Sequence, residues 1–329
     1  MAVTGESSQP SPDRSELDGA RTRPAVSVVV PFAGSVAAAQ ATLGRLAVLE
    51  LRPGDEIVIA DNSDDGSMRA ALRAAGAPAA ARWVAAHGLR SAYFARNVGA
   101  EAAGNQWLLF LDGDVRPVPG LLNAFLSPVA DSRDGALAGS VKGDPDQASL
   151  AARYARSRGY LDQERSLNNS YRPAAVTANL LVRTEAWMAA GRFVEDVQSG
   201  EDYDFCWRMQ DAGWTLGYRP DALVYHLHRE TVAALLRQVR RDAAGRSWLR
   251  RRRPGSFAKA HAIRDALRAG GAALRWGVTG DRERAAFRAL DAAVSLTDAL
   301  GEHTSNLAVR SEQSRRLRPR RQNPPSDPA

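Results

Sequence analysis

The sequence predicts an α/β protein with a mostly parallel sheet, followed by a helical C-terminal extension. Short apolar runs alternate with helical stretches through the first part of the chain, and this alternation is typical of parallel sheets. The runs are apolar at nearly every position, as expected of strands that are buried on both faces. The extension is predicted from residues 230–300, which are rich in Ala, Arg and Leu and contain no strand-like run.

The elements before Gly120 follow one another in strand-and-helix order. Strands are expected at residues 26–30, 56–60, 83–85 and 107–111, and helices at 36–49, 67–75 and 91–104. Beyond Gly120 the alternation loosens. There we expect strands near residues 136–141, 175–182 and 222–226, and helices at 184–190 and 201–212. Strands of mixed direction at one side of the parallel sheet account for this second part.

The 329 residues divide into four predicted segments. Residues 1–24 are rich in Ser, Pro, Asp and Glu and lack an apolar core, so they are expected to be disordered and not a signal peptide. Residues 25–230 form the α/β domain, 231–305 a basic helical extension and 306–329 a disordered basic tail. No apolar run approaches the ~18 residues that span a bilayer. The single cysteine, Cys206, fits a reducing compartment, and the cytoplasm is the expected location.

Positive charge is concentrated in the last third of the chain. Residues 231–329 contain 21 Lys and Arg against 9 Asp and Glu, with the densest run at residues 250–253. Residues 237–275 intersperse these arginines with Leu, Trp248 and Phe257 in expected helices, a pattern that resembles a surface-binding amphipathic stretch. We therefore expect peripheral association with an anionic membrane at its inner face.

The strand expected at residues 107–111 runs directly into Asp112-Gly113-Asp114. Two carboxylates that flank a glycine at the end of a buried strand place hard oxygen ligands close together with little bulk between them. Mg²⁺ and Mn²⁺ take carboxylate oxygens together with substrate phosphates. The triplet therefore predicts a divalent cation site that carries a diphosphate, in preference to a plain turn.

Two other strand ends and one helix carry candidate ligand-binding residues. Pro31 and Phe32 close the first strand, and Asp61 begins a polar segment after the second, which by itself reads as a solvated turn with a helix N-cap. Ligands of α/β sheets gather at the carboxyl ends of strands, so these ends should converge on one crevice. Arg96, on the helix before the triplet, either reaches a phosphate or steers the acidic loop, unless it is an ordinary solvated arginine.

Acidic residues begin the helix expected at residues 201–212, and two histidines follow the strand near 222–226. Glu201 and Asp202 are either helix caps favoured by the helix dipole or the source of a general base for an acceptor hydroxyl. His226 and His228 lie two residues apart, which puts both imidazoles on one face of an extended chain. Beside candidate carboxylates, they are as consistent with a metal ligand as with a structural role.

Taken in order, these segments resemble the inverting GT-A glycosyltransferases of family 2. The resemblance covers residues 24–230 and keeps the order and spacing of the family's motifs, which match residues 26–31, 61–63, 95–99, 108–114, 177–180 and 200–208. It implies the Rossmann-like GT-A fold, with a mostly parallel sheet and mixed edge strands.

The resemblance implies five residues at the donor. Pro31 and Phe32 would border the nucleotide, and Asp61 would contact its base or ribose. Arg96 would lie by the diphosphate, and Asp112 would face the ribose or sugar of the donor.

It also implies the metal ligands and the base. Asp114 would bind Mn²⁺ or Mg²⁺, and His226 matches a histidine that completes the metal site in many relatives. Asp202 would be the general base, with Glu201 supporting the acceptor pocket. The reaction implied is transfer of a sugar, with inversion, from a UDP-, GDP- or dTDP-linked donor to an acceptor hydroxyl of a cell-envelope glycan, a glycolipid or a small molecule.

The sequence departs from the family's pattern at two places. Residues 32–34 read Phe-Ala-Gly where relatives often carry Thr-Tyr-Asn, and the loop at residues 62–66 is short. Both places touch the nucleotide pocket, so the base of the donor stays open.

Other classes fit the sequence less well. A nucleotidyltransferase would need a Gly-rich loop with Arg and Lys after the first strand, and residues 32–35 supply none. A dinucleotide-dependent dehydrogenase would need G-x-G-x-x-G there. A nucleotide-sugar-binding module without catalysis stays open, although Asp114, Asp202 and His226 argue against it. Nucleic acid is not an expected partner, because the basic region lacks the interleaved aromatics of a stacking platform.

Overall fold

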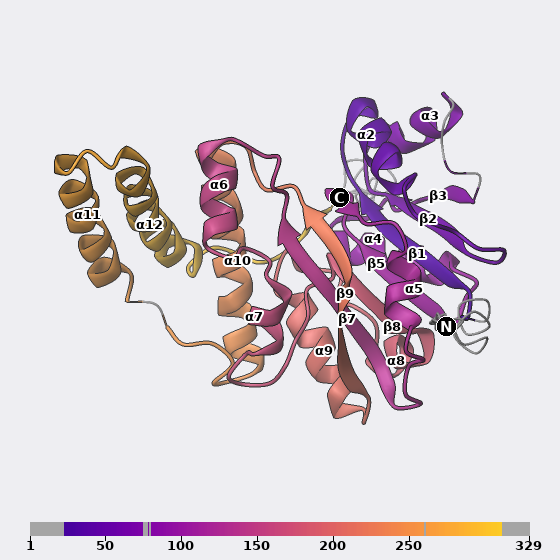
Figure 1. Ribbon diagram of the computed structural model, residues 1–329. Helices are drawn as coiled ribbons and strands as arrows, with labels where there is room; N and C mark the ends of the chain where they lie inside the picture. Colours follow the sequence, from indigo (N-terminus) through magenta and orange to yellow (C-terminus); the bar gives the residue numbers. More distant parts are fainter. Residues whose placement is uncertain (1–22, 75–77, 79, 260, 311–329) are drawn as a thin grey trace, which may run out of the picture.

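The computed structural model describes residues 23–74, 78, 80–259 and 261–310. In this part of the chain, eight strands form one sheet in the order β3-β2-β1-β5-β8-β7-β9-β6, flanked by helices (Figure 1). The strands are β1 (Val26–Phe32), β2 (Glu56–Asp61), β3 (Ala81–Ala85), β5 (Trp107–Leu111), β6 (Val115–Pro117), β7 (Asp134–Gly143), β8 (Asn179–Arg183) and β9 (Thr215–His226). A second, small sheet pairs β4 (Leu89–Arg90) with β10 (Val309–Arg310).

The first half of the large sheet is parallel, as the sequence predicts. β3, β2, β1 and β5 pair in parallel. Val28, Val29 and Val30 of β1 are fully buried, because both faces of these strands are covered. The second half is mixed: β8 runs antiparallel to β5 and β7, β9 is parallel to β7, and β6 is antiparallel to β9. The predicted fold class is confirmed.

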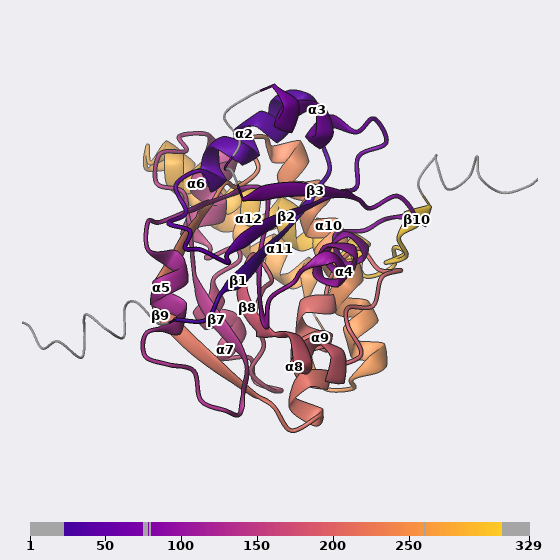
Figure 2. The same cartoon turned by 90° about the vertical axis from the view of Figure 1, so that its right-hand side faces the viewer.

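Helices cover both faces of the sheet. One face packs against α2 (Val36–Leu46), α3 (Ser67–Arg73) and α5 (Leu121–Leu126). The other packs against α4 (Ala92–Ala102), α8 (Thr184–Ala189) and α9 (Glu201–Asp211). Figure 2 shows α2 and α3 on one side of β1 and β2, with α4 on the other. Serines begin two of these helices: Ser35 caps α2, and Ser91 caps α4.

The C-terminal part of the chain is helical, as expected. Its helices are α10 (Val232–Arg252), α11 (Ala262–Val278) and α12 (Arg282–Gly301). α10 buries Leu235, Val239 and Leu249, which join it to the rest of the protein. α12 packs on α10, and α11 lies outermost, packed on α12 (Figure 1). Among the described helices, none combines the length and apolar character that a bilayer crossing requires.

The structure corrects several element bounds. The strand expected at residues 175–182 begins only at Asn179, because Val176 and Thr177 donate their backbone N–H groups to the side chains of Gln163 and Asp202 instead of to a strand. The strand near 222–226 is the end of the longer β9. Three short helices, α5, α6 (Leu150–Ser157) and α7 (Gln163–Leu167), were not expected.

The predicted boundaries of the two terminal segments are also wrong by a few residues. Arg23, which lies within the segment expected to be disordered, donates to Asp55 Oδ1 at 2.9 Å. At the other end, Asn306 is buried and its Oδ1 accepts from the backbone of Ser199 at 3.1 Å, so the chain stays packed as far as Arg310. The rest of both segments, residues 1–22 and 311–329, lies outside the described residues.

Candidate active site

A cleft of about 890 Å³ opens at the carboxyl ends of β1, β2 and β5. Pro31 and Phe32 come to it from the end of β1, Asn62 and Ser63 from the loop after β2, and residues 112–114 from the end of β5. The parallel arrangement of these strands brings their ends to one edge of the sheet, where ligands of α/β proteins bind. The predicted convergence on one crevice is therefore present.

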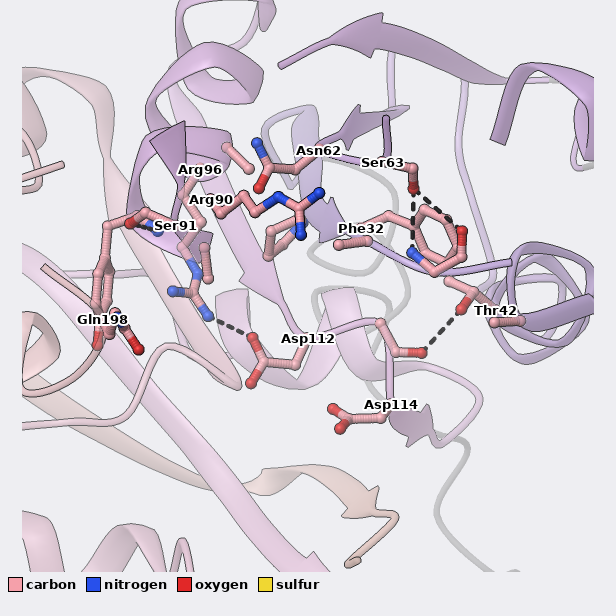
Figure 3. A pocket seen from close by; sticks show the side chains of 18 of the residues that line it. Phe32, Thr42, Asn62, Ser63, Arg90, Ser91, Arg96, Asp112, Asp114 and Gln198 are labelled. Carbon is pink, nitrogen blue, oxygen red and sulfur yellow. Dashed lines mark hydrogen bonds and ion pairs between the residues drawn. The ribbon is translucent and has the colours of Figure 1, made fainter. Parts of the chain in front are cut away.

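Helix α2 contacts the backbone of the acidic triplet through two hydrogen bonds. The backbone oxygen of Gly113 accepts from Thr42 Oγ1 at 3.1 Å and from Arg45 Nη2 at 2.6 Å. Figure 3 shows Thr42 reaching toward this turn between Asp112 and Asp114. Sequence reasoning missed both α2 residues. Their spacing of three places them on one face of the helix, and a polar pair among Ala and Leu is the signal that could have found them.

Asp112, Asp114 and His226 form a compact group of potential metal ligands. One ligand atom from each lies within 4.8 Å of the other two. His226 Nε2 is 3.3 Å from Asp114 Oδ1, and Arg229 Nη1 is 3.5 Å from Asp114 Oδ2. Burial would raise the pKa of Asp114, but the neighbouring His226 and Arg229 outweigh it and hold the pKa well below its usual range. Two carboxylates with one imidazole suit Mn²⁺ or Mg²⁺.

The second histidine takes no part in this group. The ring of His228 lies 5.4 Å from that of His226, between centroids. Its backbone N–H donates to Gln147 Oε1 at 2.7 Å, and burial lowers the pKa of its imidazole to about 4. The structure therefore separates two histidines that their spacing alone left equivalent, and the one beside the carboxylates is His226, which the family resemblance had selected.

Arg96 of α4 pairs directly with Asp112 (Figure 3). Its side chain is almost fully buried, and its guanidinium lies 5.2 Å from the ring centroid of Tyr93. Burial acts to lower the pKa of Arg96, but the charges of Asp112, Asp202 and Tyr93 and the hydrogen bond to Asp112 together outweigh it and raise the pKa. This pair is the contact expected of an arginine that steers the acidic loop, and a contact of Arg96 with a phosphate stays a prediction.

Asp202 borders the cleft from the first turn of α9. Its Oδ2 accepts from the backbone N–H of Thr177 at 3.0 Å and from Thr177 Oγ1 at 3.1 Å. Within the described residues its Oδ1 has no hydrogen-bond partner. Burial and the nearby charge of Asp202 raise the pKa of Tyr93, which lines the same cleft, well above its ordinary value. Asp202 thus has one oxygen fixed by Thr177 and a second, buried oxygen that no side chain or backbone group of the described residues fixes and that lies on the side of Tyr93.

Glu201 does not line the cleft. It is fully buried, and its Oε1 accepts from the backbone of Val194 at 2.6 Å and from Arg208. Burial, opposed only in part by Arg208, raises the pKa of Glu201 to about 8. The geometry gives no support to its expected place in the acceptor pocket. Glu201 instead fastens the loop before α9 to the helix.

Asp61 is also withdrawn from the cleft. It is fully buried, and its carboxylate accepts from the backbone N–H groups of Ser63 at 3.0 Å and Met68 at 3.1 Å. The segment forms a turn before α3, as one interpretation of the sequence expected, but Asp61 is buried instead of solvated and the N-cap position of α3 is Gly66. The neighbouring Asn62 and Ser63 line the cleft in its place.

A second cavity of about 470 Å³ adjoins the cleft. The two share walls at Tyr93, Leu161 and Asp202. The second cavity is lined by aromatic and acidic side chains, including Tyr160, Asp162, Tyr203, Phe257 and Asp298. The sequence did not predict this cavity, because it needs α7, α9, α10 and α12 to come together.

Helix α10 completes the wall between the two cavities. Gln238, Arg241 and Asp242 line the cleft, and Gln238 and Asp242 also line the second cavity. Sequence reasoning missed all three. Their spacing of three and four residues puts them on one helix face, which is the signal that could have found them.

The dense arginine run at residues 250–253 is largely occupied inside the protein. Arg250 pairs with Glu302 at 2.9 Å, and Arg253 with Asp211 at 2.7 Å. Arg252 lies over Trp248 and faces Asp204. The run therefore joins α10 to α9 and to the residue after α12, and most of its charge is not free for an outside surface.

Comparison with known proteins agrees with this architecture. The pre-mycofactocin glycosyltransferase of Mycobacterium tuberculosis is 34% identical over 139 residues, which are 41% of this chain and 30% of that protein. The chain therefore aligns with less than a third of that relative's length. The glycosyltransferase AglE of Haloferax volcanii is 28% identical over 222 residues, covering 67% of this chain and 72% of that protein.

A solved structure shares the fold. The mannosyltransferase PcManGT from Pyrobaculum calidifontis, in complex with GDP-Man and Mn²⁺, superposes with a TM-score of 0.57 at 20% identity, covering 84% of this chain and 88% of its own. This likeness confirms the GT-A fold. The family model described as glycosyltransferase like family 2 matches residues 24–245, which is more than half of the sequence. The chain belongs to glycosyltransferase family 2.

Proposed function

We propose that this protein transfers a sugar from a nucleotide-diphosphate donor to an acceptor hydroxyl, with a divalent metal ion and with inversion at the anomeric carbon. One observation carries the proposal. The potential metal ligands Asp112, Asp114 and His226 and the partly unengaged carboxylate of Asp202 border the same cleft. A cation site for a leaving diphosphate and a base for an incoming hydroxyl are the two groups that such a displacement needs.

The donor would lie along the ends of β1, β2 and β5. Pro31, Phe32, Asn62 and Ser63 offer walls for the nucleoside. Asp114 and His226, with Asp112, would hold Mn²⁺ or Mg²⁺, which supplies positive charge to the diphosphate as the glycosidic bond breaks. Both hard carboxylate oxygens and imidazole are present in the group, so the residues fit the ion.

Asp202 would act on the acceptor. As the acceptor oxygen bonds to the anomeric carbon, its proton passes to Asp202, and the electron pair of the breaking C–O bond leaves with the nucleoside diphosphate. Thr177 fixes the carboxylate through Oδ2, which leaves Oδ1 to receive the proton. Direct displacement inverts the anomeric centre and needs no covalent intermediate.

The acceptor would enter through the second cavity, which meets the cleft at Asp202. The aromatic rings of Tyr160, Tyr203 and Phe257 offer apolar faces, and Asp162 and Asp298 offer hydrogen-bond acceptors. This lining suits a hydroxyl-bearing acceptor with an apolar part, such as a glycolipid or a small glycoside. Arg165 and Arg246 are the basic residues of that lining.

A thermal-shift panel tests the proposal. The purified full chain is heated with UDP-, GDP- and dTDP-sugars, each with and without Mn²⁺. We expect one nucleotide class to raise the melting temperature only when Mn²⁺ is present, because the ion links the carboxylates to the diphosphate. No shift with any donor would contradict the proposal. A shift without any release of nucleoside diphosphate would favour a binding module without catalysis.

A further inference from the structure

Helix α11 has one face against the protein and the rest of its circumference outside. Among the described elements, α12 is the one that α11 packs against extensively. Ala266 and Ala269 are the buried residues of this contact. Figure 1 shows α11 at the far end of the molecule from β1 to β3, with α12 between it and α10. A helix in this position should carry polar residues over its outer surface.

The outer surface of α11 is instead apolar along one line. Ile263, Leu267, Leu274 and Val278 are 73%, 73%, 76% and 90% exposed. Their spacing of four, seven and four residues places them within one narrow sector of the helix, here called the apolar stripe. Four large aliphatic side chains lined up in water are unfavourable unless something covers them.

A row of arginines runs beside the apolar stripe. Arg264, Arg268 and Arg275 each follow a stripe residue directly in sequence, so each lies about 100° further round the helix. Arg264 lies 3.5 Å from Asp265 in an ion pair. Among the described residues, no ion pair or hydrogen bond engages the side chains of Arg268 and Arg275. The one acidic residue of α11, Asp265, lies beyond the arginine row and away from the stripe. The exposed surface is therefore apolar along one line and positive along the next.

We propose that α11 docks in the plane of an anionic lipid surface, with the apolar stripe in the acyl boundary and the arginine row at the headgroups. An apolar face bordered by arginines is what an interfacial helix presents to such a surface. Long arginine side chains can bury their stems and keep the guanidinium at the headgroups. The charge also argues against a second copy as the occupant, because stripe-to-stripe packing would add a second arginine row to the same interface.

This surface is the last part of the one that the sequence suggested, extended to Val278. The sequence placed the membrane contact across residues 237–275, with residues 250–253 as its densest charge. Arg250 and Arg253 of that run form ion pairs within the protein, so the run is not a free basic surface. Phe257 packs against the protein core. The docking surface is therefore α11 by itself, and it does not depend on the proposed transfer reaction.

Co-sedimentation with vesicles tests the proposal. The full chain is mixed with vesicles of phosphatidylcholine containing phosphatidylglycerol, and with vesicles of phosphatidylcholine only, at low and at high salt. We expect binding to the anionic vesicles at low salt that weakens as salt screens the arginines. The double variant Leu267→Gln/Leu274→Gln should reduce the partition coefficient at least ~10-fold, because it removes the centre of the apolar stripe. Arg268→Gln/Arg275→Gln should reduce it about 5-fold for each charge removed.

Matched controls separate α11 from the rest of the surface. Val129→Gln/Met188→Gln removes two exposed apolar side chains elsewhere, and Arg73→Gln/Arg133→Gln removes the same charge from other exposed sites. Both controls should bind vesicles like the unmodified chain. Equal loss in α11 and control variants, or no sedimentation of the unmodified chain at low salt, would overturn the proposal. So would a dimer in light scattering that only Leu267→Gln/Leu274→Gln dissociates, which would make the stripe an interface between copies.

Discussion

His226 and Asp114 are joined twice. His226 Nε2 lies 3.3 Å from Asp114 Oδ1, and the backbone N–H of Leu227 donates to the backbone oxygen of Asp114 at 2.9 Å. The second contact continues the antiparallel pairing of β6 with β9, in which Val115 lies opposite His226. Strand pairing therefore brings the histidine to the acidic triplet across more than a hundred residues of sequence, and the potential metal site depends on this register.

His226 and His228 should differ in their effect on metal binding. His226→Gln removes the imidazole that faces the carboxylates, so we expect the affinity for Mn²⁺ in the presence of a nucleoside diphosphate to fall at least ~10-fold. His228→Gln should leave it nearly unchanged, because the His228 ring is outside the ligand group. Calorimetric titration of both variants measures the difference. Equal losses would mean that the site uses both histidines.

Asp202 should be needed for turnover and dispensable for donor binding. Asp202→Asn keeps the shape of the side chain and removes the proton acceptor, so release of nucleoside diphosphate should slow by at least ~100-fold while donor affinity stays the same. Thr177→Val removes one of the two donors to Oδ2 and keeps the backbone donor, so its effect should be smaller. Normal turnover in Asp202→Asn would move the role to another carboxylate of the cleft, such as Asp242.

Glu201 should make the fold less stable at alkaline pH. Burial raises its pKa to about 8 in the folded chain, above its ordinary value of 4.5. A raised folded-state pKa contributes stability that is fully present below about pH 4.5 and is lost as pH rises through about 8. The free energy of unfolding should therefore fall over this window by a few kcal/mol, in order of magnitude.

The comparison of two glutamate variants isolates this effect from other titrating groups. In Glu201→Gln the fall between pH 5 and pH 8 should be much smaller than in the unmodified chain. Glu185→Gln alters an exposed glutamate of α8 and should keep the full pH dependence. Chemical denaturation at a series of pH values gives the three curves, and three parallel curves would rule out a buried, protonated Glu201.

The sequence predicted those parts of the protein that depend on local pattern. The fully buried strands β1, β2 and β5 read as apolar runs because both faces of each are covered. The acidic triplet stood out because it follows such a run. The sequence also predicted Arg96 and Asp202 as residues of the cleft. Each lies in the N-terminal part of its helix, and both line the cleft.

The residues whose surroundings the sequence did not predict have one physical cause in common. The role of each side chain depends on partners that are far away in the sequence. Asp61 and Glu201 looked like exposed acids, but each is buried under backbone donors that only the folded loops provide. Thr42 and Arg45 gain their role from a carbonyl about seventy residues away. The run at residues 250–253 looked like a free basic surface because its acidic partners come from α9 and from the end of α12.

The central claim is that Asp114 binds a metal ion that carries the donor's diphosphate. The most direct measurement is calorimetric titration of the matching nucleoside diphosphate, with and without Mn²⁺, into the unmodified chain, Asp114→Asn and Asp146→Asn. Asp146 is an exposed carboxylate outside the cleft and serves as the control. We expect Mn²⁺-dependent binding in the unmodified chain and in Asp146→Asn, and none in Asp114→Asn, with all three chains equally folded by circular dichroism. Undiminished Mn²⁺-dependent binding in a folded Asp114→Asn chain would contradict the claim.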